Sequence, residues 1–536
     1  MAQPQDDRPP DALLQRADLQ AVVDAQVRRD GAALIERLDA SDPAVRARAA
    51  FALASVQDTA AVPALLRLLR DSVPEVRADA AFALGQMPTG APAEPLLRVL
   101  GRERDAVVQR RLLEALGKTG GPASLQSLLR FGLPDARDPD LARAVAHYGM
   151  RDVFGETDTT GTAAREVALD WLVEHLTADR GDTRRTAAYV FSRLDPAVWE
   201  GRADTLRAVL DSYDRSDPAA RHLIRALGAV EERSDAPRLQ RWLREAPDWR
   251  TRVNAARALG SVPNALRTRQ ALQGALDDSV GHVAITAAQS LAGADWTPAD
   301  ADGIASWIEA HPDRWRVIAP LLHGLARNAP AGGGATTRVF PEVDRWQGVG
   351  DPVPYAAMLG ALAPLDTTAA RHRLADAAEA SDPRVAASAL SALAERWERE
   401  RPAAEGVYFA LFAAGVSRAD VATINAAAPV LADSLFRSRG AADTLAATYD
   451  RLTSPDDLEA MTAVLQALGQ TSGRAADATL RGALDHPHPA IRTAAAEGLA
   501  ALGDTSVSAA PTPVPETPSM DWDALSALGP APRFVL

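Results

Sequence analysis

Side chains that could serve as nucleophiles, bases or metal ligands are few and irregularly spaced in this chain. It has no cysteine, which excludes disulfides, thiolate zinc sites and cysteine nucleophiles. Its nine histidines are scattered, and the nearest pair, His486 and His488, lies in a Pro-rich turn without a further ligand nearby. We interpret this pair as part of a turn, and we expect neither a metal nor a cofactor.

Carboxylates are abundant, but their number alone produces pairs by chance. Glu231 and Glu232, near His222, are one such pair among 71 acidic residues. No pattern joins a nucleophile, a base and an orienting group. The Gly-rich stretch 331–335 is not followed by Gly-Lys-Ser/Thr, so it predicts a flexible loop and not a phosphate-binding site. We assign no catalytic residue and do not expect an enzyme.

The clearest order in the chain is a phrase that returns about every 32 residues, first at residues 42–53 and then at 73–85. A period of this length predicts a stack of helical hairpins, because one hairpin cannot bury its apolar face alone. In the unit at 62–85, the apolar spacing predicts a first helix over 62–70 and a second over 74–84. Pro74 suits the first turn of the second helix, and Gly85 is a plausible stop.

The register can be followed through an Ala-Leu pair near the end of each second helix. Its leucines are Leu53, Leu84, Leu116, Leu227, Leu259, Leu291, Leu393, Leu468 and Leu499. The signal weakens between Leu116 and Leu227, where 138–141 and 184–188 look like degenerate units, and again over 296–366. We predict an all-α solenoid of roughly a dozen hairpins. Its segments are a tail and cap helix (1–30), repeats (31–300), degenerate repeats with the Gly-rich loop (301–366) and further repeats (367–505).

The phrase resembles the HEAT repeat, in the short variety named from phycobilin lyases. The matching residues are 42–46 (Asp-Pro-Ala-Val-Arg), 382–385 (Asp-Pro-Arg-Val) and 488–492 (His-Pro-Ala-Ile-Arg). The resemblance covers about residues 30 to 505. It implies the solenoid fold but brings no catalytic residue, and a role in the maturation of chromophore proteins is one alternative that it leaves open.

The resemblance also implies that the second helix of each hairpin lines a concave face. The exposed position is then the x of Ala-Ala-x-Ala-Leu, which is occupied by Phe51, Phe82, Glu114, Arg225, Arg257, Gln289, Ser391, Gln466 and Glu497. Two successive aromatics, on helices about 10 Å apart, could grip an extended peptide. The alternative is that they pack between units or under the cap helix. Our candidate binding residues are Phe51, Phe82, Glu114, Arg225 and Arg257.

An arginine recurs at the turn that leads into the second helix of several units, as Arg46, Arg77 and Arg492. Beside Asp42 or Asp71, it predicts a ladder of exposed ion pairs along one edge, worth about 0–1 kcal/mol each. Partner binding by these arginines is the alternative.

Charge and hydropathy restrict the partners. With 58 basic against 71 acidic residues, the net charge is −13, which argues against binding to a nucleic-acid backbone. The sequence contains no run of 18 apolar residues, so we do not expect insertion into a membrane. The first residues lack the features of a signal peptide, so we expect a cytoplasmic protein, or a periplasmic one if the true start lies further upstream.

The composition changes after the last repeat. Residues 506–519 form a Pro-rich linker. The following residues, 520–536, predict a short amphipathic helix and a strand-like end, Arg533-Phe534-Val535-Leu536. Together with runs at 18–30, 54–59, 81–86 and 113–118, this tail resembles bacterial fusions of HEAT repeats to a cyclophilin-type peptidyl-prolyl isomerase. The isomerase domain itself has no counterpart in the sequence.

The sequence therefore favours a non-catalytic scaffold that binds a protein or peptide on a concave surface. The alternative is the substrate-gathering arm of a cyclophilin-type isomerase whose catalytic domain is absent from this chain. The oligomeric state and the identity of the partner are open.

Overall fold

The computed structural model describes residues 16–88, 92–130, 138–150, 159–262, 266–328, 334–401, 404–418 and 420–504. Within these ranges every regular element is an α-helix or a short 3₁₀-helix. The chain divides into two compact units, the first ending at Val230 and the second beginning at Glu231. The prediction of an all-α solenoid is confirmed.

The first unit begins with a single helix, α2 (Ala17–Val27), and continues as six hairpins. These hairpins are α3 (Gly31–Arg37) with α4 (Pro43–Val56), α5 (Val62–Leu68) with α6 (Pro74–Leu84), α7 (Ala93–Leu100) with α8 (Ala106–Thr119), α9 (Pro122–Leu129) with α10 (Asp138–Gly149), α11 (Thr159–Glu174) with α12 (Gly181–Phe191), and α13 (Ala203–Ser212) with α14 (Ala220–Val230).

The second unit consists of eight hairpins. They are α15 (Ala236–Glu245) with α16 (Trp249–Ser261), α17 (Leu266–Gly274) with α18 (Gly281–Ala292), α19 (Pro298–Ala310) with α20 (Trp315–Arg327), α21 (Gly334–Trp346) with α22 (Pro352–Leu359), α23 (Thr368–Ala378) with α24 (Pro383–Glu400), α25 (Glu405–Ser417) with α26 (Val421–Leu431), α27 (Ala441–Tyr449) with α28 (Leu458–Gln470), and α29 (Arg474–Ala483) with α30 (Pro489–Ala501).

Short 3₁₀-helices lie between or extend these elements. They are η1 (Thr59–Ala61), η4 (His175–Thr177), η5 (Pro196–Val198), η6 (Glu200–Arg202), η7 (Arg233–Asp235), η8 (Ala275–Asp277), η9 (Gly360–Leu362), η10 (Ser434–Arg439) and η11 (Pro455–Asp457).

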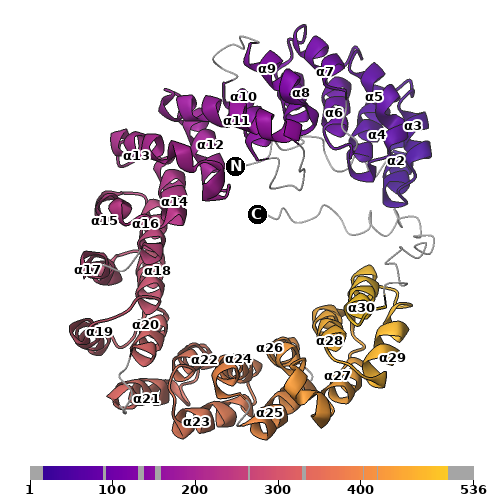
Figure 1. Ribbon diagram of the computed structural model, residues 1–536. Helices are drawn as coiled ribbons and strands as arrows, with labels where there is room; N and C mark the ends of the chain where they lie inside the picture. Colours follow the sequence, from indigo (N-terminus) through magenta and orange to yellow (C-terminus); the bar gives the residue numbers. More distant parts are fainter. Residues whose placement is uncertain are drawn as a thin grey trace. The chain divides into compact units, whose positions relative to one another are not determined.

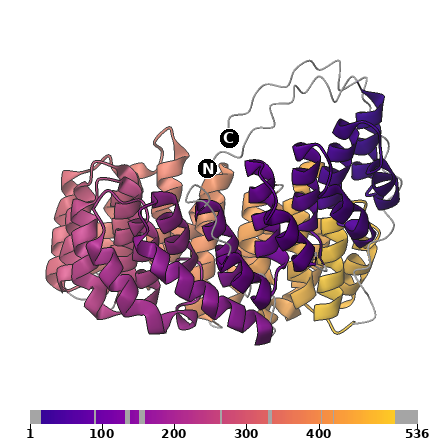
Figure 2. The ribbon, with the colours of Figure 1, turned by 90° about the horizontal axis from the view of Figure 1, so that it is seen from above.

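Each unit has two layers of helices. The second helix of a hairpin packs on the second helix of the next, as α4 does on α6 and α6 on α8, and likewise from α16 through α18 to α20. Figure 1 shows that these second helices lie on the inner side of the curve of each unit, with the first helices outside them. Figure 2, the turned view, shows neighbouring helices lying side by side along the stack. The inner layer is therefore a continuous surface within each unit.

Small side chains allow the inner helices to approach closely. Ala49, Ala50 and Ala52 of α4 are fully buried between neighbouring helices. Gly85 caps the C-terminus of α6 but has a right-handed φ of −70°, so the left-handed stop suggested by the sequence is not its role. A Cβ at this position would lie 2.9 Å from the Cα of Ala115 on α8. The glycine is required by helix packing rather than by chain reversal.

The predicted arginine ladder is present, with more contacts per arginine than expected. Nε and Nη2 of Arg46 donate to Asp71 at 2.8 and 3.1 Å, and Nη1 donates to the carbonyls of Ala40 and Ser41. The same pattern recurs in three further pairs, Arg77–Glu103, Arg184–Asp217 and Arg252–Asp278. Each arginine thus ties the turn of its own hairpin to the acidic residue of the next.

These pairs are not the exposed ones that the sequence predicted. The side chains of Asp71 and Glu103 are only 8% and 7% exposed, because each carboxylate also caps the turn in which it lies. Burial by itself would raise the pKa of Asp71, but hydrogen bonds from Arg46 and the Val73 N–H hold this pKa below its ordinary value. Arg492 keeps only the carbonyl contacts, to His486 and Pro487 at 2.9 Å, within the part of the chain that the structure describes.

The stretches with a weak repeat signal also form hairpins, and the described residues contain fourteen hairpins, close to the predicted dozen. Between Leu116 and Leu227 the core contains the large aromatic side chains of Tyr148, Phe191 and Trp199. The fold is retained because these positions remain apolar, although the sequence phrase is lost. Three predicted features lie outside the described residues: the first fifteen residues, most of the Gly-rich stretch 331–335, and the linker and tail 506–536.

Candidate functional site

The x position of the repeat phrase lies on the open side of the inner helices. Phe51 on α4 is 43% exposed, and Phe82 on α6 and Glu114 on α8 are half-buried. Arg225 on α14 and Arg257 on α16 are exposed. The helical period places the residues on either side of x against neighbouring helices, which explains why this position remains accessible.

The two phenylalanines form a stacked pair. Their ring centroids lie 5.6 Å apart with an interplanar angle of 20°. This separation is shorter than the helix spacing of about 10 Å because the side chains lean toward each other across the groove between α4 and α6. They pack between units, as the alternative interpretation required, yet Phe51 remains 43% exposed.

Cations flank this aromatic pair at both ends. The guanidinium of Arg48 lies 5.5 Å from the ring centroid of Phe51, and that of Arg111 lies 4.6 Å from the ring centroid of Phe82. Both distances are within the range of cation–π attraction. We call Arg48, Phe51, Phe82 and Arg111 the cation–aromatic row. It runs across three successive inner helices of the first unit.

Glu114 holds the end of the row in place. Its carboxylate accepts from Arg111 at 3.0 Å and from Lys118 at 2.7 Å, and the Lys118 ammonium lies 5.9 Å from the ring centroid of Phe82. Burial would raise the pKa of Glu114, but the two cations lower it below its ordinary value. Three of the predicted residues, Phe51, Phe82 and Glu114, are therefore brought together in one continuous surface.

Arg225 lies in a different cluster of the same unit, which sequence reasoning did not identify. The charges of Arg225 and of Arg185 on α12 both act on His222 of α14, and the exposed ring of Tyr189 lies against His222. The signal for Tyr189 was present, since it occupies the x position after Ala187-Ala188. It was overlooked because Val-Phe follows it where the phrase has Ala-Leu.

Arg257 belongs to the second unit and is described apart from the other four residues. It is exposed on α16. At the start of the same helix, the ring of Trp249 stacks on His282 of α18 with centroids 5.3 Å apart, and Arg250 lies 4.7 Å from the Trp249 ring centroid. Aromatic and cationic side chains thus also occur together on the inner layer of the second unit.

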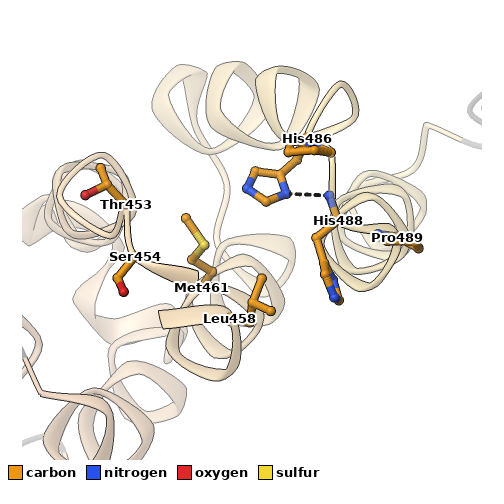
Figure 3. Close-up of a pocket in the computed structure, with 8 residues that line it drawn as sticks. Thr453, Ser454, Leu458, Met461, His486, His488 and Pro489 are labelled. Carbon is orange, nitrogen blue, oxygen red and sulfur yellow. Dashed lines mark hydrogen bonds between the residues drawn. The ribbon is translucent and has the colours of Figure 1, made fainter. Parts of the chain in front are cut away.

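A pocket of about 370 Å³ lies in the second unit between the turns that precede α28 and α30 (Figure 3). Its lining is Thr453, Ser454, Leu458, Met461, His486, Pro487, His488 and Pro489. His486 Nδ1 accepts from the His488 N–H at 3.1 Å, and His488 Nδ1 accepts from the Ala490 N–H at 3.3 Å. Both imidazoles therefore cap a turn, in agreement with the interpretation of this pair as a turn.

Two further properties concern only the described residues. No group of three or more His, Asp or Glu side chains is arranged there to hold a metal ion. None of the helices described is both long enough and apolar enough to cross a lipid bilayer.

Comparison with known proteins identifies the repeat. A family model described as HEAT repeats matches residues 31–117, 75–151 and 203–292, so these segments contain HEAT repeats. No curated protein matches the chain.

Solved structures of karyopherins are among those similar to this chain. The chain is 13% identical to Kap95p in its structure with RanGDP, with 89% of this chain and 77% of that chain covered and a TM-score of 0.43. It is 13% identical to yeast importin-beta (Kap95p), with 92% and 84% covered and a TM-score of 0.43. It is 14% identical to Kap121p in its structure with Pho4p, with 91% of this chain and 62% of that chain covered and a TM-score of 0.48. At these identities the likeness is one of fold alone.

Proposed function

We propose that this HEAT-repeat solenoid is a non-catalytic scaffold that binds a segment of a partner protein on the inner layer of its first unit. The observation that carries the proposal is the cation–aromatic row, in which stacked Phe51 and Phe82 lie between Arg48 and Arg111 on three successive helices. A solvated helix face ordinarily carries polar residues at such positions. Exposed aromatic rings held in place by packing are typical of the anchors that dominate protein interfaces.

The row suits an extended segment better than a single small molecule. It crosses α4, α6 and α8, whose successive contacts extend along the stack rather than around a closed cavity. An apolar side chain of the partner would cover the exposed part of Phe51, and the partner's backbone carbonyls or carboxylates would meet Arg48 and Arg111. No cofactor is required for this recognition. We propose a cytoplasmic location for it.

The test is capture of partners by the wild-type protein and by Phe51→Ala/Phe82→Ala. The matched control is Leu266→Ala/Val407→Ala, which removes two exposed apolar side chains, 55% and 50% exposed, from the outer helices α17 and α25. The proposal expects a partner that the control retains and the double phenylalanine variant loses.

Thermal unfolding of the same proteins separates binding from folding. Loss of the stacking costs about 0.5–1.5 kcal/mol beyond the buried area. Because both rings are partly exposed, the loss of buried area is smaller than for a core phenylalanine, and the variant should remain folded. If this variant keeps every partner and loses much of its thermal stability, the rings are structural and the proposed site is wrong.

The isomerase-arm alternative rests on the sequence of residues 506–536, outside the described part of the chain. Its support is the Pro-rich linker followed by Asp521-Trp522-Asp523 and the strand-like end at 533–536. DNA downstream that continues in frame, or after a frameshift, into a β-barrel domain would favour it. An intact stop followed by an unrelated gene would favour the free scaffold. Bilin genes in the same genome would favour the role in chromophore-protein maturation implied by the lyase-type repeat.

A further inference from the structure

The inner layer of the first unit carries a second group of side chains, on α12 and α14, that the cation–aromatic row does not include. Tyr189 on α12 is 41% exposed, and its ring meets the imidazole of His222 on α14 edge-on, with centroids 5.5 Å apart. Arg221 Nε lies 3.3 Å from His222 Nε2. We call Arg185, Tyr189, Arg221, His222 and Arg225 the arginine–tyrosine cluster. Figure 1 shows α12 and α14 next to each other.

The positive charge of this cluster is largely uncompensated. Arg185 pairs with Asp182 at 2.7 Å, but among the described residues no carboxylate forms an ion pair with Arg221 or Arg225. The charges of these arginines also affect the pKa of His222. Burial, followed by the charges of Arg221, Arg185 and Arg225, lowers the pKa of His222 to about 4, so the imidazole is neutral near pH 7. Three arginines therefore surround a neutral ring pair.

The arginines of this cluster differ from the ladder arginines in what they contact. Each ladder arginine pairs with a carboxylate of the next hairpin. In the cluster, Arg221 contacts His222, whose ring meets the exposed ring of Tyr189, and Arg225 is exposed on the same helix. Guanidinium forks match carboxylates in geometry and charge, and tyrosine offers apolar contact beside them.

We propose that the arginine–tyrosine cluster binds an acidic peptide segment of a partner protein, with Asp or Glu carboxylates on Arg221 and Arg225 and an apolar side chain on Tyr189. A peptide fits better than a nucleic acid, since the net negative charge of the chain repels an extended polyphosphate. The site is separate from the cation–aromatic row and does not depend on it.

The probe is a short fluorescein-labelled peptide in which Asp and Glu residues surround one Phe. Two control peptides carry Asn and Gln, or Lys, in place of the acidic residues. Binding of each peptide to the full chain is measured by fluorescence anisotropy. We expect the acidic peptide to bind and the amide peptide to bind at least about tenfold more weakly, because it offers no charge-assisted hydrogen bonds. Arg221→Gln/Arg225→Gln should weaken the acidic peptide by a similar factor. Phe51→Ala/Phe82→Ala should bind the acidic peptide like wild type.

The matched control is Arg70→Gln/Arg102→Gln. It removes two charges from exposed positions in the turns after the outer helices α5 and α7, and it should bind like wild type. The reversal Arg221→Glu/Arg225→Glu should lose the acidic peptide and gain the Lys peptide. In Arg221→Gln/Arg225→Gln, the pKa of His222 followed by NMR should rise from about 4 but stay below its ordinary value, because burial and Arg185 still lower it. A partial rise shows that the charge around His222 has changed in a folded protein, whereas a pKa at the ordinary value of about 6.5 would show that the variant has unfolded.

Several outcomes would overturn the proposal. One is equal weakening in the Arg70→Gln/Arg102→Gln control, which would mean that only net charge matters. Another is full displacement of the peptide by inorganic phosphate at an equivalent concentration, which would mean a general anion site. A third is a single-stranded oligonucleotide that binds more tightly than the acidic peptide and whose affinity falls by the same factor in Arg221→Gln/Arg225→Gln. Tighter peptide binding after removal of residues 505–536 would mean that the chain's own acidic tail is the occupant.

Discussion

The substitution Arg77→Ala addresses the ladder that joins one hairpin to the next. Arg77 donates to both oxygens of Glu103, at 2.8 and 3.0 Å, and to the carbonyls of Asp71 and Ser72 at 2.8 and 3.3 Å. The Arg77 and Glu103 side chains are 16% and 7% exposed. Removing the arginine therefore leaves a nearly buried carboxylate without its cation.

The loss of stability expected for Arg77→Ala depends on the hydrogen bonds that Glu103 retains. Stranding one member of a buried pair costs about 3–5 kcal/mol. Glu103 retains hydrogen bonds from the N–H groups of Arg104 and Asp105, both at 2.9 Å, which offset part of this loss. We expect Arg77→Ala to lower the local opening free energy of α6 and α8 by about 2–3 kcal/mol.

Hydrogen exchange is the suitable assay, because stacked repeats open locally and global unfolding need not be two-state. A loss of about 2–3 kcal/mol corresponds to about 30- to 150-fold faster exchange over residues 74–117. The matched control is Arg77→Gln/Glu103→Gln, which removes both charges and should cost less than the single change. A single variant that exchanges like wild type, or a double variant as costly as the single one, would refute the stranded-charge reasoning.

Two further predictions concern packing and pH. Gly85→Ala should destabilise the first unit by about 1–3 kcal/mol, because the new Cβ would lie 2.9 Å from the Ala115 backbone. Gly303→Ala should stabilise α19 by about 0.5–1 kcal/mol, because no atom lies within 4 Å of the added Cβ. A thermal midpoint that moves in the same direction for both variants would contradict the packing argument. The pKa values of Asp71, Glu103 and Asp278 are lowered in the folded protein, so these groups bind protons more weakly there than in the unfolded chain. Their contribution to the free energy of unfolding is complete above about pH 4.5 and is lost as the pH falls below about 4. Chemical denaturation at a series of pH values measures this free energy, and no decrease below about pH 4 would contradict the prediction.

The sequence was informative where the repeat phrase is intact. The N-cap aspartate and following proline of α4, Asp42 and Pro43, and the buried alanines after them have local physical reasons that any unit must satisfy. The exposed x position could be derived from the same helical period. Fold class and the accessibility of Phe51 were therefore predictable.

Features that depend on contacts between units were harder to derive. The contact of Phe51 with Phe82 requires the side chains to lean across a groove, and no spacing along one helix specifies this. The burial of Asp71 and Glu103 depends on turns of adjacent hairpins closing over them. The arginine–tyrosine cluster was missed because its unit departs from the phrase, so Tyr189 and Arg225 were not seen as neighbours.

Site-specific photo-crosslinking tests the central claim most directly. Benzoylphenylalanine is placed at position 51 or 82 on the inner layer, or at position 67 or 98 as controls, where exposed Arg67 and Arg98 lie on the outer helices α5 and α7. If the inner layer of the first unit binds a partner protein, positions 51 and 82 will capture the same partner and positions 67 and 98 will not. Capture of that partner from the outer positions alone, or equally from all four, would contradict the account.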